Sequence, residues 1–334
     1  MSSSIRVFII VAIALQTSFA KAQKINGVSF VASRENATQE HVTPVIHLGA
    51  NYAAVMPFGF IRGSDNPMVV YNTDRQWYGE RLEGAKAYIK LLQANDVKIM
   101  LKPQLWIWRG EYTGYLKMDT EEKWKMLEAS YSKFILEYAQ LAQETHTDIF
   151  SIGTELEQFV VNRPEYWNTL IKKIKTIYKG KLTYASNWDE YKRVPFWNQM
   201  DYIGVDAYFP LSEMQTPTVE SVIDGWRWWK GELAAFSKRH NKKILFTEWG
   251  YRSVDFTAKE PWTTDRTLTT VNLEAQANTT KATFEAVGNE DWFAGGFIWK
   301  WFIDHSTSGG TSNNRFTPQN KPAESVIKEY YGKN

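Results

Sequence analysis

The chain alternates between short apolar runs and longer amphipathic stretches, and this alternation limits the folds that it can adopt. The runs are typical of buried β-strands, and the stretches between them have the apolar spacing of helices. Strands that alternate with helices form a parallel sheet covered by helices, and eight such units close into a barrel. Eight strand-like runs are present, at Ile25–Ala32, Tyr52–Phe58, Lys98–Trp106, Asp148–Thr154, Leu182–Asn187, Tyr202–Tyr208, Lys243–Thr247 and Trp292–Trp299.

We therefore expect an α/β fold made of a single (β/α)8 barrel, the TIM barrel. The connections after the first and fifth runs look short or irregular, so we expect an imperfect outer ring of helices. No internal repeat, low-complexity linker or Pro-rich hinge divides the chain, and we expect residues 23–334 to form one domain. The clearest helical patterns are Arg81–Asn95, Glu121–Thr145, Pro164–Tyr178, Val219–His240, Leu273–Val287 and Pro322–Tyr331.

The first 22 residues have the pattern of a secretory signal peptide. Arg6 precedes the apolar stretch Val7–Leu15, and cleavage is expected after Ala20 or Ala22. The stretch is too short for a stable transmembrane anchor, and a retained N-terminal anchor is the alternative. The chain contains no cysteine, so no disulfide framework is expected. We expect a secreted or periplasmic protein with no membrane association in its mature form.

Charge and motifs leave several classes of function without support. The formal net charge is +2, which is too small to indicate binding to nucleic acid or to an anionic membrane. The five histidines are scattered without H-E-x-x-H spacing, so we expect no metal and no other cofactor. No G-x-S-x-G elbow, P-loop or G-x-G-x-x-G motif is present. Serine hydrolase and nucleotide-dependent chemistry therefore have no motif to support them.

Two of the apolar runs end in a glutamate. The run that starts at Asp148 leads to Glu155, and the run that starts at Lys243 leads to Glu248. The C-terminal ends of barrel strands are where the active site of this fold is built. A pair of carboxyl groups placed there has the minimum equipment for breaking a glycosidic bond.

The alternation of side chains along each run predicts that both carboxyl groups point into the barrel. Glu157 has the same parity as Glu155 and is its rival, but it lies two residues farther along, roughly 6.6 Å beyond the rim at ordinary strand rise. The faces expected to line the interior carry Ile149, Ser151, Gly153 and Glu155 in one run, and Ile244, Phe246 and Glu248 in the other.

The ends of the other runs carry polar and aromatic side chains that suit a carbohydrate. Aromatic residues make up 15% of the chain, which has 15 tryptophans. The apolar C–H faces of sugars stack on aromatic rings, and their hydroxyl groups need fixed donors and acceptors. The candidate substrate-binding residues are Arg62, Lys102, Trp106, Asn187, Asp206, Tyr208 and Trp299.

The segments Ser151-Ile-Gly-Thr-Glu-Leu-Glu157 and Phe246-Thr-Glu-Trp-Gly-Tyr251 resemble glycoside hydrolase family 113, in the clan of retaining (β/α)8 glycosidases. The resemblance extends over essentially the whole mature chain and implies activity on β-1,4-mannan. It implies Glu155 as the acid/base and Glu248 as the nucleophile. The clan usually has Asn before the acid/base, whereas Thr154 stands here, as the family pattern tolerates.

The same resemblance implies roles for three of the candidate binding residues. Tyr208 is expected to hydrogen-bond the nucleophile, Trp299 to form the floor of the subsite where cleavage occurs, and Arg62 to be the cationic partner of the nucleophile. A retaining enzyme of this kind is expected to hold its two carboxyl groups roughly 5–5.5 Å apart.

Two other functions stay open. A glycosidase of the same clan could act on another β-linked glycan, such as glucan or xylan, because mannose differs from glucose only at C2. Asn187, Asp206 and Lys102 are the candidates for reading that hydroxyl group. A non-catalytic barrel that binds glycans is the second alternative. We expect a monomer whose partner is a polysaccharide or oligosaccharide, and endo and exo action both remain open.

Overall fold

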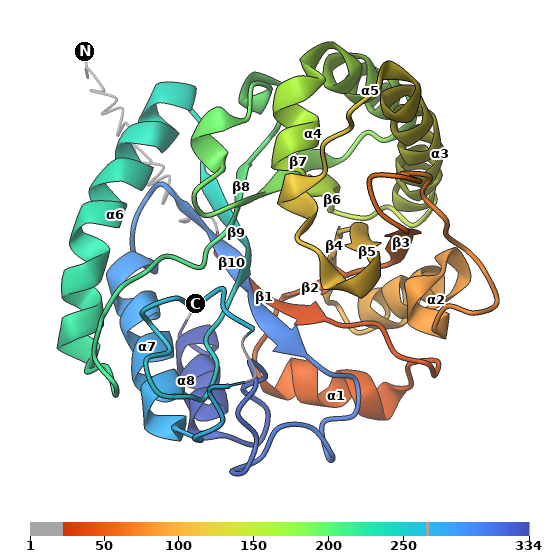
Figure 1. Ribbon diagram of the computed structural model, residues 1–334. Coiled ribbons are helices and arrows are strands. Elements are labelled where there is room, and N and C mark those ends of the chain that lie inside the picture. The colour runs from red at the N-terminus through yellow and green to blue at the C-terminus, as the bar shows by residue number, and fades with distance from the viewer. Residues whose placement is uncertain (1–22, 265–266, 334) are drawn as a thin grey trace, which may run out of the picture.

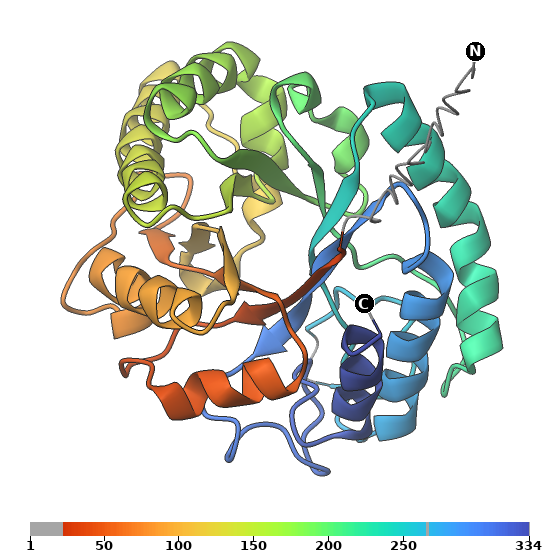
Figure 2. The same cartoon turned by 180° about the vertical axis from the view of Figure 1, so that it is seen from behind.

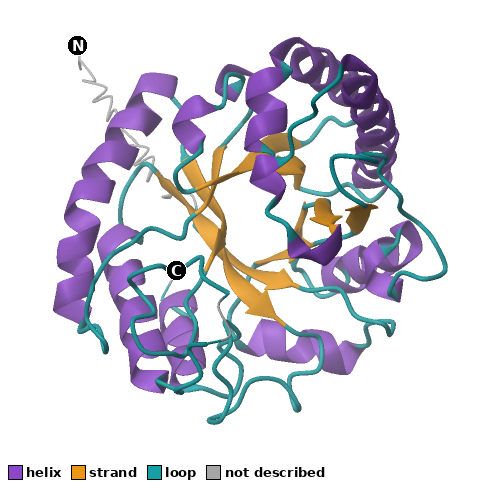
Figure 3. Cartoon of the chain, in the orientation of Figure 1, coloured by secondary structure: helices purple, strands orange, loops and turns teal. Residues whose placement is uncertain are grey.

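A computed structural model describes residues 23–264 and 267–333, so the predicted signal peptide lies outside the described residues. Eight parallel strands form a closed barrel in the order β1-β10-β9-β8-β7-β6-β4-β2, and helices surround it (Figures 1 and 3). This confirms the predicted (β/α)8 fold. The barrel strands are β1 Ile25–Phe30, β2 Tyr52–Val55, β4 Lys98–Leu101, β6 Ile149–Thr154, β7 Lys181–Asn187, β8 Ile203–Asp206, β9 Ile244–Trp249 and β10 Phe293–Trp301.

Two of the predicted runs are each broken by a proline. The runs Tyr52–Phe58 and Lys98–Trp106 divide at Pro57 and Pro103, where the chain lacks the N–H group that would continue the ladder. Beyond each proline lies a separate strand, β3 (Phe58–Ile61), which extends past the predicted run, and β5 (Gln104–Ile107), and the two pair with each other in parallel outside the barrel. This small sheet extends the chain beyond the C-terminal ends of β2 and β4.

The outer helices follow the sequence closely. Threonine or asparagine caps three of the long helices, and proline stands in the first turn of α5 and α8. No helix of the described residues is long and apolar enough to span a membrane. Figure 2 shows the ring from behind. The helices are α1 Gln39–His47, α2 Leu82–Gln93, α3 Glu121–Glu144, α4 Glu157–Asn162, α5 Pro164–Ile177, α6 Val219–His240, α7 Leu273–Val287 and α8 Pro322–Tyr331.

The ring is imperfect, as predicted, but not at both expected places. The connection after β7 contains only the short 3-10 turns Tyr191–Arg193 and Trp197–Gln199, which confirms the expectation. The connection after β1 contains α1, a helix of nine residues. Its pattern was hard to read because Pro44 lies inside it, a residue that normally disfavours a helix interior.

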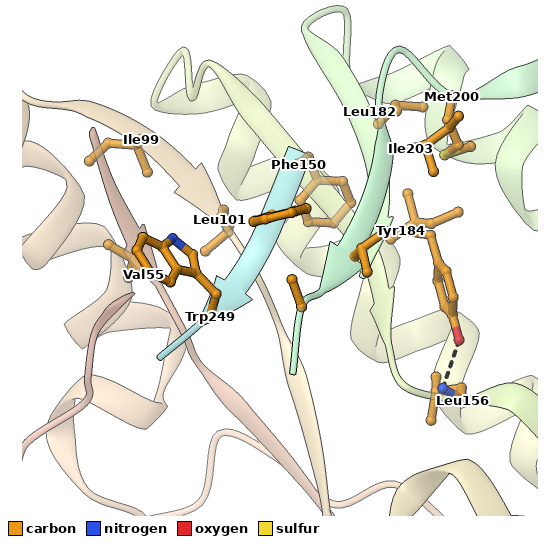
Figure 4. Packing of buried hydrophobic residues seen from close by; sticks show 14 of the residues in the cluster. Val55, Ile99, Leu101, Phe150, Leu156, Leu182, Tyr184, Met200, Ile203 and Trp249 are labelled. Atoms are coloured by element: carbon orange, nitrogen blue, oxygen red, sulfur yellow. Dashed lines mark hydrogen bonds between the residues drawn. The ribbon is translucent and has the colours of Figure 1, made fainter. Parts of the chain in front are cut away.

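The core has an outer and an inner part. The outer part fills the space between strands and helices, and Figure 4 shows some of it, including Phe150 and Tyr184. The inner part fills the barrel, where Gly27 makes room for Phe297: a Cβ atom at Gly27 would lie 2.4 Å from that ring. The barrel is therefore a packed core that supports the site above it. The inner cluster consists of Ile25, Ala54, Met100, Ile149, Leu245, Ala294 and Phe297.

Candidate active site

An extra residue in β9 places Glu248 in the site. Phe246 is opposite Val205 of β8, but the next paired residue, opposite Asp206, is Glu248, so Thr247 has no counterpart. A bulge of this kind turns the side chains beyond it. Phe246 stacks on Trp226 of α6 and thus faces the helices, while Thr247 donates a 2.7 Å hydrogen bond to Asp206.

The predicted faces of this strand were therefore wrong, although Glu248 does reach the site. Ile244 and Phe246 belong to the outer core and Leu245 to the inner cluster. Strict alternation would have put Glu248 on the helix side with Phe246. The extra residue Thr247 shifts the alternation by one position, so Glu248 points into the site instead.

A second bulge precedes Glu155. Ser151 is opposite Thr183 of β7 but Thr154 is opposite Ala185, so β6 has one residue more than its partner. Gly153 was predicted to line the interior, and this is wrong: a Cβ atom there would meet Tyr131, Trp167 and Tyr184 of the outer core. Ile149 does join the inner cluster.

The backbone around Glu155 is held on both sides. Its N–H group donates to the Ala185 carbonyl oxygen at 2.8 Å, and its φ angle of 49° is in the left-handed region, which is uncommon for a residue other than glycine. The next N–H group, that of Leu156, donates to the Tyr184 hydroxyl group at 2.7 Å (Figure 4). These contacts over-determine an unusual conformation, as is common at functional sites.

The rival Glu157 is engaged elsewhere. It begins α4. Its carboxylate forms an ion pair with Arg193, in the first 3-10 turn after β7, and accepts a hydrogen bond from that side chain. Its charge is thus already paired outside the cluster around Glu248, and Glu155 is the better candidate.

A buried lysine holds the Glu248 carboxylate. Lys102, which follows β4 and is fully buried, lies 2.9 Å from Glu248 Oε2 and 3.0 and 3.1 Å from the two oxygens of Asp206. The Tyr208 hydroxyl group donates to Glu248 Oε1 at 2.5 Å, as the resemblance implied. The cationic partner of Glu248 is thus Lys102 and not Arg62, which is exposed beyond the end of β3.

The charges of this cluster depend on one another. Burial lowers the pKa of Lys102, but the carboxylates of Asp206 and Glu248 outweigh it and raise that pKa above its usual range, so the ammonium stays charged. Burial raises the pKa of Asp206, and the contact with Lys102 opposes this shift. Together the three groups form a buried network in which one cation neutralises two carboxylates only in part.

Glu155 differs from Glu248 in its electrostatic state. Burial raises its pKa well above the usual range, and the charges of Asp206 and Glu248 raise it further. No hydrogen bond reaches its carboxyl group from any residue that the structure describes. Glu248 is thus held by two donors, whereas the Glu155 carboxyl group has a raised pKa and no such donor.

The sequence did not point to Glu190, which supports the same region. Glu190 is buried and accepts hydrogen bonds from the Tyr184 hydroxyl group at 2.6 Å and from the Asn187 N–H group at 3.0 Å. Burial raises its pKa to about 7. It therefore orients Tyr184, whose hydroxyl oxygen receives the Leu156 N–H group beside Glu155.

Tyr112 is a second residue near Glu155 that was not predicted from the sequence. It precedes the 3-10 turn Thr113–Tyr115 and lies close enough to Glu155 and Glu190 for their charges, after burial itself, to raise its pKa. Its hydroxyl group interacts with the side chain of Asn187, a predicted binding residue at the end of β7. No pattern in the surrounding sequence marked Tyr112 as part of the site.

Aromatic rings at the strand ends provide sites for stacking. Trp106 of β5 is 51% exposed, and Trp299 of β10 is half-buried. Trp188, which follows β7, stacks on Trp262 with their ring centroids 5.0 Å apart. Exposed and half-buried aromatic rings of this kind can stack on sugar rings.

The described residues contain no group of three or more His, Cys, Asp or Glu side chains that could hold a metal ion. Lys102 instead supplies the positive charge at the carboxylate cluster. The expectation that no cofactor takes part stays a prediction.

Comparisons with known proteins agree with this geometry. Residues 31–321 match the model of Glycoside Hydrolase Family 113. The GH113 beta-mannanase AaManA from Alicyclobacillus acidocaldarius, solved in complex with ManMIm, is 24% identical, with a TM-score of 0.80 over 93% of this chain and 97% of that chain. Another structure, of a GH113 beta-1,4-mannanase complex, is 22% identical, with a TM-score of 0.81 over 93% of this chain and 100% of that chain.

More distant structures share the barrel only. A beta-glucuronidase from Faecalibacterium prausnitzii is 13% identical, with a TM-score of 0.59 over 93% of this chain and 49% of that chain. No match is found among curated protein sequences.

Proposed function

Because the chain belongs to glycoside hydrolase family 113, we propose that it hydrolyses β-1,4-mannan or mannooligosaccharides by a retaining double displacement. The observation that carries this proposal is the contrast between the two strand-end glutamates. Glu248 is bound by Lys102 and Tyr208, whereas Glu155 has a raised pKa and no partner among the described residues. A retaining mechanism needs one ionised nucleophile and one protonated acid.

Each step of the mechanism uses one of these groups. Glu248 attacks the anomeric carbon with one carboxylate oxygen, while Lys102 and Tyr208 fix the orientation of the carboxylate. Glu155 donates its proton to the departing glycosidic oxygen, so the leaving sugar departs as a neutral alcohol. Glu155, now ionised, takes a proton from a water molecule whose oxygen attacks the anomeric carbon of the glycosyl-enzyme, and the bond from that carbon to Glu248 breaks and releases its carboxylate. The second inversion restores the original anomeric configuration.

Mannan is the proposed backbone because similar solved structures are described as β-mannanases. Their identity of 24% or less leaves room for glucan or xylan, which would use the same two glutamates. A non-catalytic glycan-binding barrel has less support, because such a protein has no need for a carboxyl group with a raised pKa facing a bound carboxylate.

The test of the substrate is reducing-sugar release by the purified protein on β-mannan, glucomannan, β-glucan and xylan, with product lengths followed over time. Short mannooligosaccharides released early from mannan would support endo action on that backbone. Activity on a different backbone alone would keep the glutamates and change the substrate. No release by folded protein from any of the four would favour the binding protein.

The roles of the glutamates are tested by variants. Glu248→Ala should abolish turnover, and azide should restore it with inverted product; strong residual hydrolysis without azide rescue would refute the nucleophile. Glu155→Gln should slow mannan hydrolysis far more than glycosylation by an activated aryl mannoside, whose leaving group needs no proton. Equal losses on both substrates would argue against Glu155 as the acid.

We also propose export of the protein as a monomer after removal of a signal peptide that lies within residues 1–22. Amino-terminal sequencing of the exported protein should find a start after Ala20 or Ala22. An intact first segment on protein found only in membranes would favour the retained anchor.

A further inference from the structure

Two positive charges lie beside the carboxylate cluster and take no part in the mechanism above. Lys300 comes directly after Trp299 near the end of β10 and is partly buried. Its ammonium lies 5.4 Å from the centre of the Trp299 ring and 4.8 Å from that of the Phe302 ring. Among the residues that the structure describes, no carboxylate forms an ion pair with Lys300.

The second charge belongs to Arg315, whose backbone is fixed. Its N–H group donates to the Asn313 side chain at 2.8 Å, and its carbonyl oxygen accepts from the buried Lys321 ammonium at 2.8 Å. The next residue, Phe316, packs its ring on Tyr208 with centroids 6.0 Å apart. Arg315 is thus held next to the support of the nucleophile, and its side chain is exposed.

The two cations repel each other. Burial lowers the pKa of Lys300, the charge of Glu248 opposes this shift, and the charge of Arg315 adds to it. Glu248 forms its ion pair with Lys102 and not with Lys300, and its two oxygens receive hydrogen bonds from Tyr208 and Lys102. A partly buried cation that forms no ion pair with a described carboxylate and feels the charge of a second cation is unfavourable for the free protein.

We propose that Lys300 and Arg315 form a subsite for a carboxylate on the glycan, so that β-linked chains with a uronate-type sugar at or beside the point of cleavage bind more tightly than their neutral counterparts. The proposal rests on the proposed function. The Lys300 ammonium over the Trp299 ring and the exposed guanidinium of Arg315, whose charge acts on it, would bind a carboxylate by charge-assisted hydrogen bonds. The bound anion would offset the repulsion between the two cations.

A carboxylate subsite can be distinguished from a role in which Lys300 only supports Glu248. If Lys300 served only to keep Glu248 ionised, it would affect neutral and acidic substrates alike. A carboxylate subsite instead affects the ratio between them. The ratio of affinities is therefore the quantity to measure.

The experiment measures binding in a Glu155→Gln protein, which keeps the side-chain hydrogen bonds of the site because the Glu155 carboxyl group makes none with the described residues. Calorimetric titrations use a mannooligosaccharide, the same oligosaccharide oxidised at C6 to the carboxylate, and the methyl ester of that acid. The ester has the shape of the acid without the charge. We expect the acid to bind on the order of tenfold or more tightly than its ester, with a preference that falls as salt is added.

Two variants and one control are made in the same background. Lys300→Gln and Arg315→Gln should each lower the preference for the acid by roughly tenfold, and Arg315→Gln carries little risk to folding because the side chain is exposed. Arg227→Gln, which removes an exposed arginine that pairs with Asp224 on α6, should leave the preference unchanged.

Equal affinities for acid and ester, or a preference that survives both substitutions, would overturn the proposal. Equal loss of affinity for acid, ester and neutral chain in Lys300→Gln would overturn it too, in favour of the supporting role. Hydrolysis of neutral mannan by the wild-type protein is measured separately, so a failure of the proposed function would be seen apart from a failure of this subsite.

Discussion

Replacing Lys102 with methionine separates the buried charge from the length of the side chain. In the wild-type protein this ammonium contacts both oxygens of Asp206 and one oxygen of Glu248, and none of its surface is exposed. Methionine fills a similar volume but leaves two buried carboxylates facing each other without a cation. The variant should therefore lose both stability and the orientation of the nucleophile.

Removing one partner of a buried ion pair costs about 3–5 kcal/mol of unfolding free energy, and we expect Lys102→Met to lose that amount near neutral pH. The double variant Lys102→Met/Asp206→Asn removes one of the two stranded charges and should recover roughly half of the loss. In this double variant, Thr247 can still donate its hydrogen bond to the amide oxygen at position 206. Activity should stay low in both variants, because Glu248 keeps only Tyr208 as a donor.

The assay is urea unfolding with the midpoint and slope fitted at about pH 5 and about pH 8. Burial already raises the pKa of Asp206, and loss of the ammonium raises it further. The folded variant then binds protons that the unfolded chain does not. The loss of unfolding free energy relative to the wild-type protein should therefore shrink toward low pH. Lys86→Met, which breaks an exposed pair with Glu144, is the control.

A loss below about 1 kcal/mol near neutral pH, similar to that of a surface pair, would refute the reasoning. A deficit that is the same at both pH values would also refute it, because the stranded carboxylates would then not be its cause.

The other predictions concern the hydrogen bonds around the two glutamates. Tyr208→Phe removes the 2.5 Å bond to Glu248, and kcat/KM should fall by about 10- to 100-fold, as expected for a bond to a charged group; an unchanged kcat/KM would contradict the assigned role. Glu190→Gln removes a carboxyl group whose pKa burial raises from 4.5 to about 7. That group stabilises the fold fully below pH 4.5, and this contribution, about 3 kcal/mol, is lost as the pH rises through about 7. Urea unfolding of both proteins against pH measures the difference, which should vary in that window and not outside it.

The barrel could be predicted because its signals are local and repeated. The helices α6, α7 and α8 have the predicted bounds, since each has a clear apolar period and a cap or proline at its start. The division of two runs into β2 with β3 and β4 with β5 was missed, although Pro57 and Pro103 stand at the breaks. Apolar residues on both sides of each proline made the two strands look like one continuous run.

The site was predicted in part, and the errors of that prediction have physical causes. Strand-end reasoning selected Glu155 and Glu248, but the argument from alternating faces failed for Glu248 because a period of two assumes an unbroken ladder. Lys102 was expected to bind substrate, whereas it contacts Glu248 directly. Glu190 lies in an irregular connection, where no periodicity shows which way a side chain points.

The bulges of β6 and β9 bear on how this enzyme can be engineered. A design that restored an even strand register would delete one residue from each strand, for example Thr247 from β9. The barrel would then have a more regular ladder, and Glu248, now directly after Phe246, would still point to the opposite face and into the site, but the hydrogen bond from Thr247 to Asp206 would be lost. Idealising the backbone of β9 therefore keeps the direction of Glu248 but removes a donor to Asp206, the carboxylate that shares Lys102 with it, so stabilising substitutions are better sought in the helices and in the N-terminal halves of the strands.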